Sequence, residues 1–297
     1  MKTMILAAVL LVRPAAGAVL AEEYDARLSA PAGAVEVLAG GETDAWREAE
    51  DGMPLSSGDK VRTGADSSAE ISLDDGGLIR LGPDSALDVS SLSAGSSSFF
   101  LRLGSIVAKI RAGFLKPGKR LQVRTPPAVC AIRGTEFGVE HDEVSGETTA
   151  GVFDEGSLSV ASADKDGKTL AEETVGKGRE VRLRAGARAL RQGAMLKLLR
   201  HRKSLTAARG RLETLRKNWK RLDPEKRREL RKRFMVRKAV RNARDKKKGA
   251  AGPNQKGGGL KSGGEPGRPN LPDKLKNAIK RADDRTGNKQ KRKMLGE

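Results

Sequence analysis

The chain has 297 residues, and its charge is divided unevenly along the sequence. Residues 1–190 carry 22 Lys and Arg against 28 Asp and Glu, a net −6, whereas residues 191–297 carry 36 against 10, a net +26. One cysteine excludes an intramolecular disulfide framework and a cysteine-based zinc site, and two distant histidines leave little material for a metal centre or a serine-type triad. Aromatic residues make up 3% of the chain, too few for stacking single-stranded nucleic acid. We therefore expect neither an enzyme nor a bound metal or cofactor.

The first 21 residues have the pattern of a secretory signal peptide. Lys2 precedes an apolar run over residues 4–12, and small residues allow cleavage after Ala18 or Ala21. The run is too short to span a bilayer, and no later stretch reaches the ~20 apolar residues of a transmembrane helix. We expect export to the periplasm or the extracellular space, either soluble or peripheral on the envelope.

Between residues 34 and 186, apolar and polar residues alternate in short runs that end at Gly, Asp, Ser or Pro. Residues 69–73 and 78–81 flank an Asp-Gly pair and predict a hairpin. Similar runs follow at residues 99–110, 121–123, 129–132, 137–139, 148–153, 158–160 and 181–183. This recurrence predicts a mainly β domain over residues 34–186, as a short-strand sandwich, barrel or solenoid.

One motif in this region resembles a known family. The run over residues 123–139 is similar to the central signature of the FecR-like domain, the extracytoplasmic part of ferric-citrate regulators, and residues 152–160 are similar to its continuation. Residues 55–64 and 69–81 resemble its entry strand and first hairpin. The family-signature residues, structural or partner-binding, are Thr125, Pro126, Arg133, Gly134, Thr135, Phe137, Glu155 and Gly156. The resemblance implies a β domain that binds a protein or polymer partner of the envelope.

Two signature residues also have a physical interpretation. Gly134 stands where the apolar alternation reverses, as a tight bend between strands requires. Arg133 either supports the bend by binding carbonyls or pairing with Glu136 or Glu155, or contacts an anionic partner.

The basic half is expected to be helical. Leu205, Leu212 and Trp219 belong to an apolar stripe with helical spacing, and Asp223-Pro224 predicts the start of a second helix. We expect a basic αα-hairpin over residues 194–245 and a disordered Gly/Pro/Lys-rich tail over residues 246–297. The candidates for contact with a polyanion are Arg216, Lys220, Arg227, Arg231, Arg237 and Lys247.

Two functions follow as expectations. The main one is a non-enzymatic envelope protein whose FecR-like domain binds or scaffolds a protein or polysaccharide. In it, residues 194–297 form a cationic arm for anionic lipid, lipopolysaccharide or wall polymer, or serve solubility alone. Export makes nucleic acid an unlikely partner. The alternative is a FecR-type signalling regulator of an anti-sigma or iron-uptake system that retains its leader as a membrane anchor.

Overall fold

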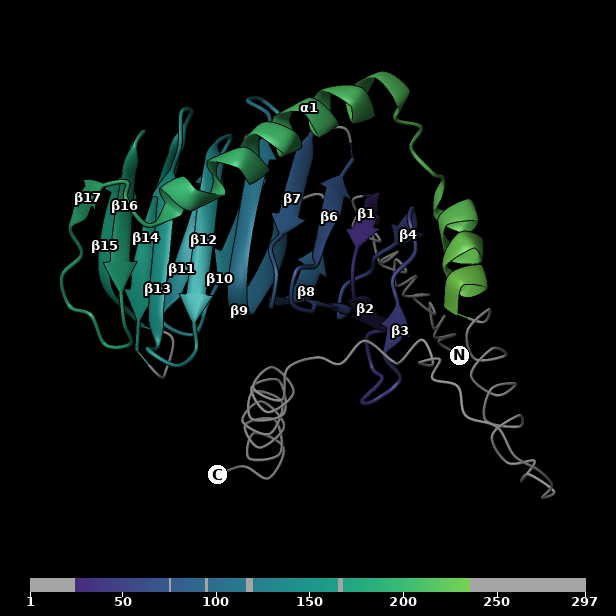
Figure 1. The fold of residues 1–297 in the computed structure, drawn as a ribbon, viewed down its shortest axis with the longest axis horizontal. Coiled ribbons are helices and arrows are strands. Elements are labelled where there is room, and N and C mark those ends of the chain that lie inside the picture. Colours follow the sequence, from purple (N-terminus) through teal and green to yellow (C-terminus); the bar gives the residue numbers. More distant parts are fainter. Residues whose placement is uncertain (1–24, 75, 94–95, 116–119, 165–167, 236–297) are drawn as a thin grey trace, which may run out of the picture.

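The computed structural model describes residues 25–74, 76–93, 96–115, 120–164 and 168–235. The expected leader, the expected tail, Arg237 and Lys247 lie outside the described residues. The prediction of a mainly β chain followed by helices is confirmed (Figure 1).

The strands follow one another closely along the chain. They are β1 (Ala26–Ala32), β2 (Val35–Leu38), β3 (Arg47–Glu48), β4 (Met53–Pro54), β5 (Lys60–Thr63), β6 (Ser68–Leu73), β7 (Gly77–Leu81), β8 (Ala86–Leu92), β9 (Ser96–Ile110), β10 (Arg120–Arg124), β11 (Ala128–Arg133), β12 (Glu136–Asp142), β13 (Glu147–Val152), β14 (Ser157–Ala163), β15 (Thr169–Val175), β16 (Arg179–Leu183) and β17 (Gln192–Ala194). β1 and β17 extend the sandwich beyond the predicted limits of residues 34 and 186.

These strands form two layers that share β9. The helix-side sheet has the order β4-β1-β6-β7-β9-β12-β13-β16-β17. The opposite sheet has the order β3-β2-β5-β8-β9-β10-β11-β14-β15. Of these pairs, β9 with β10 is parallel and the others are antiparallel. Consecutive strands are mostly neighbours, which accounts for the regular turn signals in the sequence.

The long strand β9 passes from one sheet to the other at Gly104. Its first half pairs with β8 and β10, and its second half pairs with β7 and β12. Gly104 has φ +87°, and a Cβ there would lie 2.2 Å from the Oγ of Ser85 and 2.6 Å from its Cα. Only glycine fits this crossing, because a side chain would meet the positive φ and the backbone of the loop before β8.

The hydrophobic core fills the space between the sheets. Alternation directs Ile71 of β6, Ile79 of β7 and Phe137 of β12 inward, each fully buried. Cys130 of β11 also faces this core, and burial raises the pKa of its thiol to about 12. It acts as a small apolar residue, unreactive at neutral pH.

The helices lie outside the sandwich. A 3-10 turn, η1 (Leu198–His201), leads into α1 (Arg202–Asn218), which crosses the outer face of β7, β9 and β12 (Figure 1). Residues 219–223 are extended, and a second helix covers residues 224–235 beside β4. The expected αα-hairpin is therefore corrected: two helices are present, but each lies on the β body, because each carries its own apolar and ionic contacts to the sheets.

Candidate functional site: the helix-covered acidic face

Four buried carboxylates lie on the outer face of the helix-side sheet. They are Glu70 of β6, Glu136 and Glu140 of β12, and Glu180 of β16, each between 1% and 7% exposed. We call them the acidic row. Each alternates with core residues of its strand, so its side chain points away from the core and under the C-terminal helical segment. A buried carboxylate is stable only with hydrogen-bonding or charged partners, and these come largely from the segment that contains α1.

Glu136 is held by two cations. Arg209 of α1 donates from Nε at 2.6 Å and from Nη2 at 2.5 Å, and Lys109 of β9 lies 3.0 Å away. Burial alone would raise the pKa of Glu136, but the hydrogen bonds and charges of Arg209 and Lys109 outweigh it and lower the pKa. The pair is bidentate, the stronger arrangement of an arginine and a carboxylate.

Glu140 binds the residues at the entry to α1. Lys197 lies 3.2 Å from its Oε1, the His201 Nε2 lies 3.1 Å from its Oε2, and Arg200 also pairs with Oε2. Burial opposes ionisation here as well, but the bonds from His201 and Arg200 and the charges of Arg200 and Lys197 lower the pKa of Glu140 to about 2. The carboxylate is therefore ionised at any ordinary pH.

Glu180 and Glu70 complete the row. Glu180 accepts the backbone N–H groups of Lys197 at 3.2 Å and Leu198 at 3.1 Å, at the start of the helical segment where such groups lack helical partners. Glu70 accepts from Arg80 of β7 at 2.8 Å, and Arg211 of α1 lies 3.4 Å from its other oxygen.

Apolar contacts run between these ion pairs. Leu198 lies over Gly151 of β13, where an added Cβ would come within 2.9 Å of its Cδ1. Leu205 packs with Val107 of β9 in one buried cluster, and Leu212 packs with Leu78 of β7 in another. The predicted apolar stripe of α1 thus packs on the helix-side sheet, and α1 is part of the folded body.

The second helix is also fixed by arginines. Arg227 is 8% exposed, donates to the carbonyl oxygen of Leu55 and lies 3.9 Å from Asp25. Arg231 donates to both oxygens of the fully buried Asp59, at 2.6 and 2.7 Å, and to the carbonyl of Pro54 at 3.0 Å. Their prediction as contacts for an external polyanion is corrected, because both guanidinium groups bind buried acceptors of the β body.

The other described candidates are more accessible. Arg216 forms an ion pair with Glu213 one turn earlier at 3.1 Å, and the Lys220 side chain is exposed. These two residues stay candidates for contact with a polyanion.

Five signature residues serve the fold. Phe137 is in the core, and Gly134 has φ +52° between β11 and β12. Gly156 has φ +83°, and a Cβ there would lie 2.5 Å from the Gly134 carbonyl oxygen, while the buried Thr135 donates from Oγ1 to the Glu155 carbonyl at 2.5 Å. Thr125 lies 2.9 Å from Thr148 through the two hydroxyls. The first four residues close the corner at which the chain passes between sheets.

Three signature residues are exposed. Pro126 lies in the turn before β11, and Glu155 pairs with Lys109 at 2.5 Å. Arg133 ends β11 on the outer face of the opposite sheet, and among the described residues its guanidinium has no hydrogen bond or ion pair. The predicted pairing of Arg133 with Glu136 or Glu155 is therefore wrong, since other cations hold both carboxylates. Contact with an anionic partner remains the hypothesis for this residue.

The sequence interpretation missed the acidic row and its partners. A signal was present: Glu70 stands between Ala69 and Ile71, at the outward position of an alternating strand, and the two halves of the chain carry opposite net charges. Which acid would meet which base depends on the path of α1, and no local pattern specifies that path.

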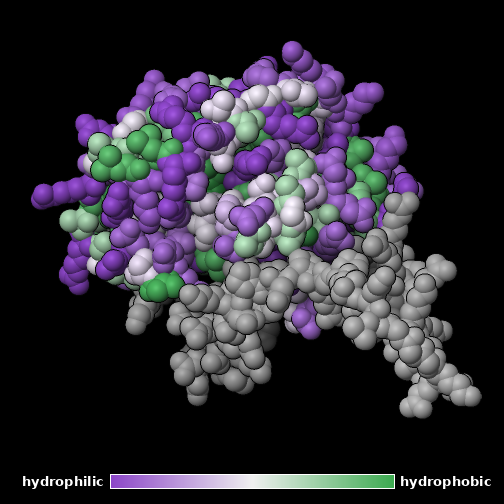
Figure 2. Space-filling model, viewed as in Figure 1, coloured by the Kyte–Doolittle hydropathy of each residue, from purple (hydrophilic) through white to green (hydrophobic). Residues whose placement is uncertain are grey.

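The surface of the described residues gives no catalytic constellation. Figure 2 shows a mostly hydrophilic face with hydrophobic atoms in small separate groups. Within the described ranges, no three His, Cys, Asp or Glu side chains cluster as a metal site, and no helix is long and apolar enough to cross a membrane. Glu136, Glu140 and Glu180 and their partners are engaged with one another, an arrangement suited to holding α1 in place.

One comparison with known proteins identifies a family for part of the chain. The family model described as FecR protein matches residues 59–157, from the end of the loop before β5 to the start of β14. No curated protein matches the chain. Two crystal structures of a candidate anti-sigma factor from Parabacteroides distasonis, at 1.65 and 2.50 Å resolution, align at 12% identity with a TM-score of 0.39. Each alignment covers 47% of this chain and 61% of the other. Residues 59–157 thus match the FecR protein family, and this segment lies within a larger β-sandwich that basic helices follow.

Proposed function

We propose that this chain is a FecR-type regulator that acts outside the cytoplasm by binding a protein partner, without chemistry of its own. The FecR family match over residues 59–157 carries the proposal. The arrangement of the sandwich supports it, since α1 covers one outer sheet face and its Arg209 and Arg211 bind carboxylates of that face. Binding therefore falls to the opposite sheet, where Arg133 is exposed at the end of β11.

The test compares a deletion strain with the native bacterium by transcript sequencing. A regulator predicts altered expression of a defined gene set, restored by the wild-type chain. Arg133→Glu should fail to restore it, because reversing an exposed charge disrupts an anionic contact without disturbing the core. The matched control is Arg228→Glu, an exposed arginine of the second helix, which should restore expression. Unchanged transcripts on deletion would contradict the regulator and favour an envelope scaffold.

Export is part of the same proposal, supported by the leader pattern of residues 1–21. N-terminal sequencing of the native protein and cell fractionation test it. A mature chain that begins after Ala18 or Ala21, in the periplasmic or extracellular fraction, fits export with cleavage. An intact N-terminus in the membrane fraction fits the anchored regulator, and recovery from the cytoplasm contradicts both.

A smaller role in polyanion contact is supported by exposed cations on the two helices and on the segment between them, namely Lys217, Lys220 and Lys232. Salt-sensitive retention of the full chain on anionic vesicles tests it, because exposed charges are screened by salt. Charge-neutral Gln at these three positions should reduce retention. Retention unchanged by the substitutions would reject this surface.

A further inference from the structure

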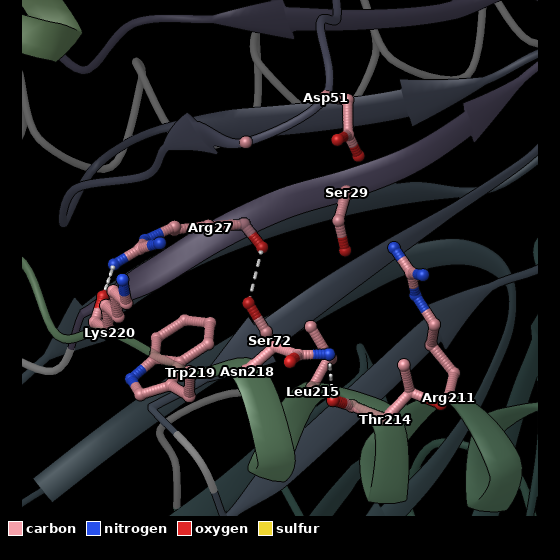
Figure 3. Close-up of a pocket in the computed structure, with 11 residues that line it drawn as sticks. Arg27, Ser29, Asp51, Ser72, Arg211, Thr214, Leu215, Asn218, Trp219 and Lys220 are labelled. Atoms are coloured by element: carbon pink, nitrogen blue, oxygen red, sulfur yellow. Dashed lines mark hydrogen bonds between the residues drawn. The ribbon is translucent and has the colours of Figure 1, made fainter.

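A cavity of about 260 Å³ lies where α1 ends over the edge of the helix-side sheet (Figure 3). Its floor is the outer face of β1 and β6, with Ser29 and Ser72, and one wall is the last turns of α1. Trp219 and Lys220 close one side (Figure 3). Small-molecule pockets usually measure about 300–1,000 Å³, so an occupant of this cavity would be compact.

Three polar atoms of the lining are buried without a hydrogen-bond partner among the described residues. They are the Oγ of Ser29, whose residue is 7% exposed, the Nε1 of Trp219, and the Nε of Arg211, which lies 3.4 Å from the Glu70 Oε2 in an ion pair. Figure 3 shows the Arg211 side chain rising from α1 toward the strand that carries Ser29. A buried polar group without a partner destabilises the fold, so the Ser29 hydroxyl and the Trp219 N–H at one cavity indicate a missing acceptor.

The charge around the cavity is positive. Glu70 lies between two cations, Arg80 and Arg211, and Asp25 lies between Arg27 and Arg227. At Glu70, two cations therefore face one acid.

Lys220 adds a further positive charge to the lining. The acid of the lining, Asp51, accepts the backbone N–H of Ala30 at 2.8 Å. The excess favours an anion, and the forked guanidinium of Arg211 matches the oxygens of carboxylates and phosphates.

The remaining wall is apolar. Leu215 and the indole ring of Trp219 line the cavity, and Arg27 stacks over that ring at 4.3 Å from its centroid and donates to the Lys220 carbonyl at 2.7 Å. The stacking holds the tryptophan in place at the edge of the cavity. We propose that this cavity binds a compact carboxylate- or phosphate-bearing solute, with its anionic group on Arg211 and Ser29 and any apolar part against Leu215 and Trp219.

Trp219 fluorescence in the full-length chain reports binding, and Trp46→Phe removes the signal of the other tryptophan. The probes are succinate for a carboxylate and inorganic phosphate for a phosphate. We expect a saturable change with at least one of them, and the stronger response identifies the anion class. Arg211→Gln should weaken binding at least tenfold, whereas the control Arg216→Gln, equal in charge change and on the same helix, should stay within twofold.

Ser29→Ala gives a second readout that does not depend on charge. Because its hydroxyl lacks a partner, the free variant should melt no lower than the parent, yet bind the probe at least threefold more weakly. Three outcomes would overturn the site: no saturable response to either probe, equal weakening by Arg211→Gln and Arg216→Gln, or unchanged affinity of Ser29→Ala.

Discussion

The two outer faces of the sandwich use the same residue types in different ways. On the opposite sheet, ion pairs join neighbouring strands, such as Arg62 with Glu36 at 2.7 Å and Arg102 with Asp88 at 2.5 Å. On the helix-side sheet, the acidic row has partners far away in the sequence, such as Arg209, which is 73 positions from Glu136, and Arg211, which is 141 positions from Glu70. Within the described ranges, α1 covers only the second of these faces. The difference shows that the basic half of the chain is not a free arm throughout, because α1 is docked on the helix-side sheet.

The cations of that half fall into two groups. Arg209, Arg227 and Arg231 bind acceptors that are 0–1% exposed or lie on the buried backbone, and they act in folding. Lys220 and Arg228 are exposed and are available to partners. A stretch of like charge is attractive to polyanions only to the extent that its charges are not already neutralised within the fold.

The largest expected change in the free energy of unfolding tests whether α1 is packed on the sheet or free. Leu205→Ala should lower the free energy of unfolding by about 3 kcal/mol, because the side chain is fully buried between α1 and the sheet. Urea unfolding measures it. The control Leu199→Ala removes a leucine that is 44% exposed and should cost less than about 1 kcal/mol. Equal small costs at both positions would show that α1 does not pack on the sheet.

Lowering the pH should destabilise the helix-covered face, because it protonates Glu140. Its pKa is about 2 in the folded chain, against an ordinary value of 4.5, so its contribution to stability is complete above pH 4.5. The contribution is lost as the pH falls from 4.5 to about 2, and amounts to roughly 3 kcal/mol. Glu140→Gln should therefore be less stable at pH 7 and lose less stability on acidification than the wild type. Parallel pH profiles of the two proteins would contradict the assigned ion pairs.

A matched pair of valines compares the faces directly. Val107 points outward from the helix-side sheet and is 3% exposed under α1, whereas Val129 points outward from the opposite sheet and is only half-buried. Val107→Ala should cost about 2 kcal/mol and Val129→Ala less than about 1 kcal/mol. Thermal unfolding of both variants gives the comparison, and equal costs would remove the distinction between a covered and an uncovered face.

Much of the fold could be predicted because the signals for a strand, apolar alternation and turn residues, lie within a few neighbouring positions of the sequence. Alternation at residues 69–73 and the Asp-Gly turn specified the β6–β7 hairpin, and Gly134 marked a real corner. The position of α1 could not be predicted in this way. Its stripe fits a neighbouring helix as well as a sheet, and the choice is made by Glu136, Glu140 and Glu180, which need cations once they are buried.

The same limit applies to the candidate site. Arg227 and Arg231 look like their exposed neighbours in a basic run, and only the tertiary position of Asp59 and the Leu55 carbonyl distinguishes them. The cavity beside Trp219 is likewise invisible in the sequence, since its lining comes from strands and a helix separated by more than a hundred residues.

A double-mutant cycle on Glu136 and Arg209 tests most directly whether the basic helix is part of the folded body. Glu136→Gln, Arg209→Gln and the double variant are compared with the wild type by urea unfolding. Because Arg209 is 37% exposed, we expect a coupling energy of about 1–2 kcal/mol rather than that of a fully buried pair. A coupling energy of zero, with both single variants as stable as the wild type, would contradict the docking of α1 on the acidic row.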